Sequence, residues 1–501
     1  MTVLKRRHGL IAPLAAALIA SFVGGCASSC SGSEGSASAP MGATTVAAQL
    51  PPPMTAPAPA LPARFDALQK NTFDFFWDTA NPVNGLVPDR WPNPPFASIA
   101  SVGFALTAYP IGVERGYITR AQARSRALAT VRFFRDAAQG PEATGKSGYK
   151  GFFYHFLDMK SGARFGTTEL STVDTSLLLA GLMFSQSYFD GTDAQETEIR
   201  AGVDAIAARV DWAWAQQNHP PKVTMGWDPE SGFISADWSG YNEAMLVVLM
   251  GLASPTQPLA ASAWTDLTAS YDANWSRTQG YDYLSFQALF AHQFTHLWVD
   301  FRGIQDAYIK GRGIDYFENS RRATYAQRAY AVSNPMHCKG YGENIWGISA
   351  SDGPGDVKVA DFAGKQRQFK DYLSRGVGLP DPFDDCTIAP SAAASSLPFA
   401  PELVIPAVQE MQQIYGTSLY GKYGFLEAFN PSFVDAQSKL SNGRVVPGFG
   451  WVDTDYLGID QGPIVGMIEN YRSDFVWHTM RKNANLRRAL LRAGFSGGWL
   501  N

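Results

Sequence analysis

The 501-residue chain has few charged residues, and its acidic and basic side chains nearly balance. Asp, Glu, Lys and Arg make up 17% of the sequence, against about 25% in an average globular protein. The 41 Lys and Arg residues and 45 Asp and Glu residues give a formal net charge of −4. Proteins that bind a phosphate backbone usually carry a basic surplus, so the sequence predicts no nucleic-acid partner.

The apolar run at residues 10–23 is too short to span a bilayer comfortably. It follows Lys5, Arg6 and Arg7 and ends in small residues, which is typical of a secretory signal. The sequence around Cys26 (VGGC) resembles a bacterial lipobox, in which the cysteine is lipidated. We therefore predict a lipoprotein signal peptide at residues 1–25. A plain signal peptide with an incidental cysteine is the alternative.

Residues 27–62 are almost all Ala, Ser, Gly, Pro and Thr. Such a segment cannot bury enough apolar surface to fold, so residues 26–62 are interpreted as a lipidated cysteine and a disordered tether. No Asp follows Cys26 to retain the protein at an inner membrane. The sequence predicts a lipid anchor in the outer membrane of a Gram-negative cell, facing the periplasm or the cell surface.

Cysteines and familiar nucleotide or nucleophile motifs are also scarce. The chain has 4 Cys residues, and only Cys338 and Cys386 lie beyond the N-terminal region. An exported protein meets an oxidising compartment, so this pair could form a disulfide, but sequence separation leaves the question open. The sequence contains no Gly-x-Ser-x-Gly elbow, Walker motif or dinucleotide glycine pattern, which disfavours hydrolases and nucleotide enzymes of those classes.

Helical periodicity dominates residues 63–501, which contain no second Pro/Ser-rich linker and are predicted to form one domain. We expect helices in the following stretches: 64–79, 98–114, after Thr119, 172–188, 197–217, 241–251, 264–275, 286–308, 320–332, 400–415 and 461–470. Strand–helix alternation and a fixed repeat are absent, which disfavours TIM barrels and solenoids. The sequence predicts an all-α fold, an (α/α)6 toroid whose loops build a cleft at one end.

Aromatic residues are abundant at 13% of the chain, which suits a protein that binds a neutral sugar ring. Carboxylates embedded among them are candidate acids and bases: Glu243, Asp460, Glu169 and Asp174. Each lies where an apolar helix is expected to begin, so each could instead complement a helix dipole or cap a helix. A glycosidase needs two such carboxyls in different environments.

His292 and His296 lie one helical turn apart, the spacing that zinc proteases use. However, Gln293 occupies the position of their catalytic glutamate, and no third ligand is evident. We therefore predict no metal. The pair is interpreted as hydrogen-bonding to a polar ligand or within the protein.

The sequence resembles the bacterial glycoamylase-like domain family, which includes the endo-β-1,2-glucanases of glycoside hydrolase family 144. The matching sequence segments occur in order through the globular part of the chain. Among them are residues 72–92 (TFDFFWDTANPVNGLVPDRWP), 169–181 (ELSTVDTSLLLAG), 238–244 (WSGYNEA), 292–306 (HQFTHLWVDFRGIQD), 341–347 (YGENIWG) and 458–463 (GIDQGP). The resemblance implies an (α/α)6 toroid, an inverting mechanism and hydrolysis of β-1,2-glucan. It implies Glu243 as general acid, and we choose Asp460 as the carboxylate on the base side.

The expected substrate is a β-1,2-glucan or its oligosaccharides, held by aromatic platforms and polar groups, with Glu169 or Asp174 as a third carboxylate. The predicted platforms are Trp91, Trp227, Tyr241, Trp298 and Trp346. The predicted polar contacts are Arg90, His155, Asn242, His292, Gln293 and Arg302. We expect a monomer that needs no cofactor. A transglycosylase, an exo-acting enzyme and a non-catalytic glycan-binding lipoprotein remain as alternatives.

Overall fold

The computed structural model describes residues 59–92 and 96–501. The predicted signal peptide, Cys26 and nearly all of the tether lie outside these residues. The first described helix, α2 (Ala63–Thr79), begins where the predicted domain begins. In the part of the chain that the structure describes, no helix combines the length and apolar character needed to cross a membrane.

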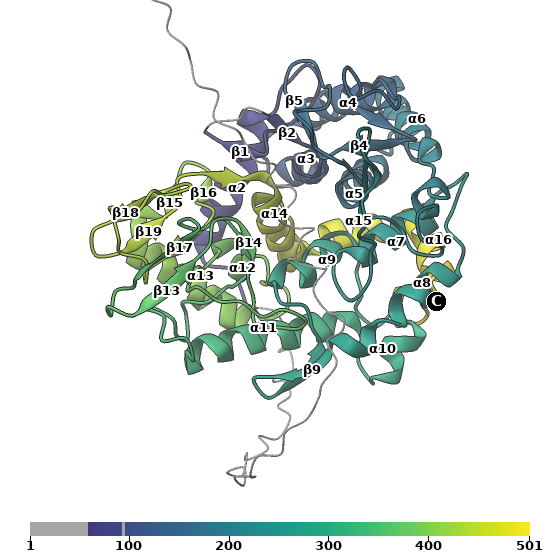
Figure 1. Ribbon diagram of the computed structural model, residues 1–501. Coiled ribbons are helices and arrows are strands. Elements are labelled where there is room, and N and C mark those ends of the chain that lie inside the picture. Colours follow the sequence, from purple (N-terminus) through teal and green to yellow (C-terminus); the bar gives the residue numbers. More distant parts are fainter. Residues whose placement is uncertain (1–58, 93–95) are drawn as a thin grey trace, which may run out of the picture.

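The helices that line the centre of the fold are apolar on nearly every face. All of α7 (Ala244–Ala253) is buried, and so are most residues of α3 (Ile99–Glu114) and α5 (Thr172–Tyr188). They form a ring with α9 (Phe294–Trp298), α12 (Pro390–Ala394) and α14 (Gly458–Ser473) (Figure 1). Two glycines bring α3 and α5 together, because a Cβ on Gly181 would lie 2.0 Å from the carbonyl oxygen of Gly103.

A second layer of amphipathic helices surrounds this ring. It comprises α2, α4 (Arg120–Asp136), α6 (Ala194–Arg209), α8 (Ser262–Thr268), α11 (Tyr316–Ser333) and α13 (Pro401–Tyr415). In α4 the buried side chains Ala123, Ala127, Val131 and Phe134 recur at helical spacing, and Thr119 caps the helix, which begins after it as expected. The two layers make the predicted (α/α)6 toroid. Two further helices follow at the C-terminal end of the chain. The helix α15 (Phe475–Arg481) packs against α5, α9 and α14, and α16 (Ala484–Arg492) packs against α7.

Short strands occupy the long connections between helices, and no pattern in the sequence predicts them. The largest sheet has the order β3-β4-β6-β7-β8 and comprises Gly148–Tyr149, Phe152–Tyr154, Leu170–Ser171, Gly226–Asp228 and Gly232–Phe233. A three-stranded sheet contains β17 (Phe429–Asn430), β19 (Gly450–Val452) and β18 (Arg444–Val446).

The remaining strands pair two by two and antiparallel. The pairs are β1 (Arg90–Trp91) with β20 (Tyr456–Leu457), β2 (Phe96–Ser98) with β5 (Phe156–Asp158), β9 (Trp275–Thr278) with β10 (Tyr281–Leu284), β11 (Ala350–Ser351) with β14 (Leu373–Ser374), β12 (Val357–Ala360) with β13 (Gln366–Phe369), and β15 (Tyr420–Gly421) with β16 (Gly424–Phe425).

The predicted helix at residues 286–308 is wrong in detail. The structure breaks it into a 3₁₀ turn, η3 (Leu289–His292), and two short helices, α9 and α10 (Ala307–Gly311). Gly303 adopts a φ of 72°, outside the right-handed helical region, and Asp306 caps α10. The helices α12 and α15 were not predicted, because five and seven residues are too few to show a clear period. The helix α16 was missed although its buried residues Leu486, Ala489 and Leu490 recur at helical spacing.

Cys338 and Cys386 form a disulfide across a sequence separation of 48 residues. This settles the pairing that the sequence leaves open. The bond joins the loop after α11 to the segment before α12, and both cysteines are buried.

The N-terminal ends of the inner helices meet at one end of the toroid. Ser98 caps α3 and Ser171 caps α5, each accepting a hydrogen bond from a backbone N–H in the first turn. Glu243 precedes α7, and Asp460 lies in the first turn of α14. The fold therefore gathers at this end the carboxyl groups that the sequence singles out.

Candidate active site

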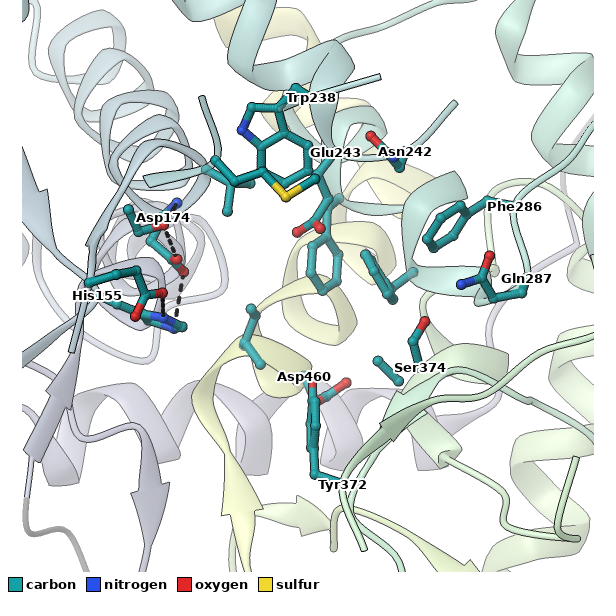
Figure 2. A pocket seen from close by; sticks show the side chains of 18 residues that line it. His155, Asp174, Trp238, Asn242, Glu243, Phe286, Gln287, Tyr372, Ser374 and Asp460 are labelled. Carbon is teal, nitrogen blue, oxygen red and sulfur yellow. Dashed lines mark hydrogen bonds and ion pairs between the residues drawn. The ribbon is translucent and has the colours of Figure 1, made fainter. Parts of the chain in front are cut away.

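An open cavity of about 1010 Å³, including its mouth, lies at this end of the toroid. All four predicted catalytic carboxyls line it, together with His155 and Asn242 (Figure 2). The other lining residues are Ser171, Val173, Met225, Trp238, Phe286, Gln287, Phe290, Phe294, Ala350, Tyr372, Ser374 and Ile459. A cavity in which polar groups converge between apolar and aromatic walls is typical of a ligand site.

Glu243 points into the cavity because its neighbour takes over the capping of α7. Asn242 Oδ1 accepts a hydrogen bond of 2.9 Å from the backbone N–H of Ala244, whereas the Glu243 side chain makes no capping bond. Burial, and then the negative charge of Asp174, raise the pKa of Glu243 to about 8, against the opposing charge of His155. At neutral pH this carboxyl therefore carries a proton. The alternative role of a helix-dipole acid does not fit a neutral side chain.

Asp460 faces the same cavity from the opposite side (Figure 2). Its Oδ1 accepts a hydrogen bond of 2.8 Å from the Ser391 hydroxyl of α12. Burial raises the pKa of Asp460 to about 6, while hydrogen bonds from Glu427 and Ser391 limit the rise. At neutral pH Asp460 is therefore mostly ionised. The structure places a carboxylic acid and a carboxylate across one cavity, in the protonation states that acid–base catalysis needs.

His155 holds two further carboxyls on a third side of the cavity. Its Nδ1 lies 2.8 Å from Glu169 Oε1, and its Nε2 lies 3.6 Å from Asp174 Oδ1. Burial opposes the charged imidazolium, but Asp174 and Glu169 outweigh it and raise the pKa of His155 to about 10. The histidine is therefore a cation between two acids. This group is positioned to orient a substrate and to set the charge that Glu243 experiences.

Arg90, a predicted sugar contact, is not among the residues that line the cavity. Its Nη1 lies 3.0 Å from Asp352 Oδ2 and 3.3 Å from Asp455 Oδ2, and its Nε lies 3.4 Å from Asp89. The guanidinium thus offsets part of the negative charge that gathers around Asp460. Removal of one partner from such a partly buried group is costly, so Arg90 stabilises the base side of the site, where Asp460 lies.

Aromatic rings form the walls, but they are not the rings that the sequence analysis selects. Trp238 stands beside Glu243 and is fixed by a 2.8 Å hydrogen bond from its Nε1 to Thr172 Oγ1, while Tyr372 lies beside Asp460 (Figure 2). Phe286, Phe290 and Phe294 line the cavity at intervals of four residues. Trp238 could have been predicted to line the site, because it belongs to the same matching segment, residues 238–244, as Glu243. Tyr372 lies in the short segment between β13 and β14, whose sequence carries no local signal of function.

Three of the predicted platforms are buried in the core instead. Tyr241, Trp298 and Trp346 are each 0% exposed, so their rings offer no face to a ligand. Trp298 stacks on Phe104, and its indole N–H donates to Thr107. These aromatics fill space between helices. A high aromatic content can therefore reflect core packing as well as a binding site.

Trp91 and Trp227 are partly buried and also lie outside the cavity lining. Trp227 packs against Tyr149 and Trp214 on the largest sheet, and Trp91 pairs with Tyr456 across β1 and β20. Neither position supports the predicted contact with the substrate in this cavity.

The predicted polar contacts His292, Gln293 and Arg302 also point elsewhere. The Gln293 amide donates to the Ala392 carbonyl and to Ser396, and Ser320 Oγ lies 3.4 Å from His292 Nδ1 and 3.0 Å from His296 Nε2. Burial lowers the pKa of both histidines to about 3, so they are neutral. Arg302 pairs with Asp300 and with Asp474, at the far end of α14. The histidine pair was interpreted as hydrogen-bonding either to a polar ligand or within the protein. The contacts with Ser320 agree with the second interpretation.

A family model described as "Putative glucoamylase" matches residues 235–484, which contain Glu243 and Asp460 but not Glu169, Asp174 or His155. A "putative glucoamylase" structure from Bacteroides uniformis is 30% identical, with a TM-score of 0.74 over 89% of this chain and 100% of that chain. An endo-β-1,2-glucanase from Chitinophaga pinensis, solved with sophorotriose and glucose, is 27% identical, with a TM-score of 0.72 over 88% of this chain and all of that one.

A curated exo β-1,2-glucooligosaccharide sophorohydrolase (non-reducing end) from Parabacteroides distasonis is 27% identical over 457 residues. The match covers 85% of this chain but only 57% of that protein. Since the likeness to the Bacteroides uniformis structure extends over that whole chain at 30% identity, the protein belongs to the glycoamylase-like family.

Proposed function

We propose that the protein is a glycoside hydrolase that cleaves β-1,2-glucan internally and inverts the anomeric configuration. The observation that carries this proposal is the pair of carboxyls across the cavity, with the pKa of Glu243 at about 8 and that of Asp460 at about 6. Pairs of acids whose environments separate their pKa values are typical of glycosidases. The named activities of the relatives from Chitinophaga pinensis and Parabacteroides distasonis support β-1,2-linked glucose as the substrate.

In the proposed reaction Glu243 donates its proton to the glycosidic oxygen while Asp460 takes a proton from the attacking water. The C–O bond to the leaving sugar breaks and a bond to the water oxygen forms, through a transition state with oxocarbenium character. Burial, together with the charge of Asp174, keeps Glu243 protonated before the reaction. Trp238 and Tyr372 provide ring surfaces on which glucose units can lie.

The time course of products from linear β-1,2-glucan tests the endo mode. An endo-acting enzyme gives a mixture of oligosaccharide lengths from the earliest samples, with the α-anomer formed first. Release of sophorose alone from the start would favour the exo mode of the relative from Parabacteroides distasonis. Transfer of glucan to a labelled sugar acceptor would identify a transglycosylase, and an unchanged glucan would leave only a binding role.

The pH profile of kcat/KM should be bell-shaped, with limbs near 6 and 8. Below the pKa of Asp460, about 6, the base becomes protonated and activity falls. Above the pKa of Glu243, about 8, the acid loses its proton and activity falls again. Because kcat/KM reports groups of the free enzyme, initial rates at low glucan concentration give this profile. A rate that keeps rising beyond pH 9 would contradict the assignment of Glu243 as acid.

The proposal also includes a lipid anchor on Cys26 and residence at the outer membrane, as the N-terminal sequence predicts. Labelling with a fatty-acid analogue in cells should be lost in Cys26→Ser. Label that persists in this variant would contradict the lipid anchor.

A further inference from the structure

A second buried carboxyl, Glu427, is in contact with Asp460 but is not among the residues that line the cavity. It belongs to the turn between β16 and β17, and its backbone N–H donates 2.9 Å to the carbonyl of Asp455. The residue is 2% exposed, and its carboxyl is in hydrogen-bond contact with that of Asp460. Glu427 does not line the cavity, so it can act on the substrate only through Asp460.

The donors around the two carboxyls are distributed unequally. Asp460 receives the Ser391 hydroxyl on Oδ1, whereas neither oxygen of Glu427 has a donor among the described residues. Two ionised carboxylates in contact repel each other strongly when buried, so such a pair shares one proton. The proton belongs on Glu427, because the group with the other donor is the better stabilised anion.

Further acidic side chains surround the pair. Asp352 and Asp453 act on Glu427, and Asp352 and Asp89 act on Asp460. Asp352 and Asp455 are themselves paired with the cation Arg90, and the Tyr372 hydroxyl lies close enough to the pair for the charges of Asp460 and Glu427 to act on it. Burial first, and then the charges of Asp460, Asp352 and Asp453, raise the pKa of Glu427 well above its usual range.

A bound cation would be another way to relieve the repulsion, but the oxygens do not converge enough. Within the described ranges, the one set of three His, Cys, Asp or Glu ligand atoms close enough for a metal is Cys338, Asp384 and Cys386. The two sulfurs of that set are already joined in the disulfide. The acids around Asp460 therefore do not form a cation site in this geometry.

We propose that Glu427 is a positioning residue: as a neutral carboxylic acid it donates its O–H to Asp460 and holds that carboxylate ionised and aimed at the attacking water. Its effect on catalysis rests on the proposed function, but its protonation does not. A hydrogen-bonded neutral partner lets a buried base stay ionised at neutral pH without a second negative charge.

Infrared difference spectroscopy tests the protonation without any substrate. The spectrum of the wild type minus that of Glu427→Gln at pH 7 should contain the C=O stretch of a neutral carboxylic acid. Glu196→Gln is the matched control, because Glu196 is 2% exposed and paired with Arg120, which lowers its pKa. Its difference spectrum should contain carboxylate bands. Carboxylate bands from Glu427→Gln would overturn the proposal, whether or not the protein cleaves β-1,2-glucan.

The pH profile tests the consequence for catalysis. Glu427→Gln keeps a donor of the same shape, so its kcat should stay within about threefold of wild type and its acidic limb near pH 6. Glu427→Leu removes the donor, so the acidic limb should rise by about one to two pH units, the value of a hydrogen bond to a charged group. An acidic limb that falls in Glu427→Gln, or does not move in a folded Glu427→Leu, would overturn the positioning role.

Discussion

Glu243→Gln is expected to lower kcat on β-1,2-glucan by about 10²–10⁴-fold, because loss of a general acid costs that much. The side chain keeps its shape but cannot give up a proton to the glycosidic oxygen. Since the wild-type carboxyl is already neutral at pH 7, the pKa being about 8, the exchange should leave folding and glucan affinity nearly unchanged. Reducing-end assays give kcat, and calorimetry with an oligosaccharide gives the affinity.

Glu198→Gln is the matched control for this variant. Glu198 lies on α6 and pairs with Arg132 and Arg135 at the protein surface, far from the cavity lining. Exposed ion pairs contribute little to stability, so this variant should behave as wild type. A Glu243→Gln enzyme that matches Glu198→Gln in kcat would remove Glu243 from the mechanism.

Asp460→Asn should be similarly inactive, with a loss of kcat of about 10²–10⁴-fold, because an amide cannot accept a proton from water. The Asn oxygen can still accept the hydrogen bond from Ser391, so the first turn of α14 should keep its structure. The activity lost should therefore appear in kcat with little change in glucan affinity.

Asp474→Asn tests whether any change of an aspartate on α14 has this effect. Asp474 caps the other end of the helix with a φ of 57°, a conformation that Asn also adopts readily. Its side chain contacts Arg302 and Arg481 rather than the cavity. Near-wild-type rates for Asp474→Asn and normal rates for Asp460→Asn would together contradict the base-side role of Asp460.

The architecture was largely predictable because long amphipathic or fully apolar helices have a clear period. The range predicted for α5 agrees with the structure at both ends, and the capping box at Thr119 marks the start of α4. Short elements were not predictable in this way. In α9 and α12 five residues make too few turns to show a period, and the strands of two to four residues depend on partners distant in sequence.

The carboxyls of the site were easier to find than its walls. Glu169, Asp174, Glu243 and Asp460 lie at helix starts, and parallel inner helices bring those starts together. An aromatic ring, in contrast, serves a core and a sugar site equally well, so Trp298 and Trp238 look alike in sequence.

Within the segment 286–298 the residues predicted to contact the substrate lie on the face that points away from the cavity. Phe290 and Phe294 line the cavity, while His292 and His296 are buried in the protein and do not line it. Glu427 could not be found at all from sequence. Its importance comes from contact with Asp460, and no local pattern records that contact.

Reducing-end release from four glucans at pH 7 tests the central claim most directly. The substrates are linear β-1,2-, β-1,3-, β-1,4- and α-1,4-glucan, each incubated with the wild type and with Glu243→Gln. The account predicts release from the β-1,2-glucan alone, and its near-complete loss in the variant. Release from the α-1,4-glucan instead, or equal release by the two proteins, would contradict it.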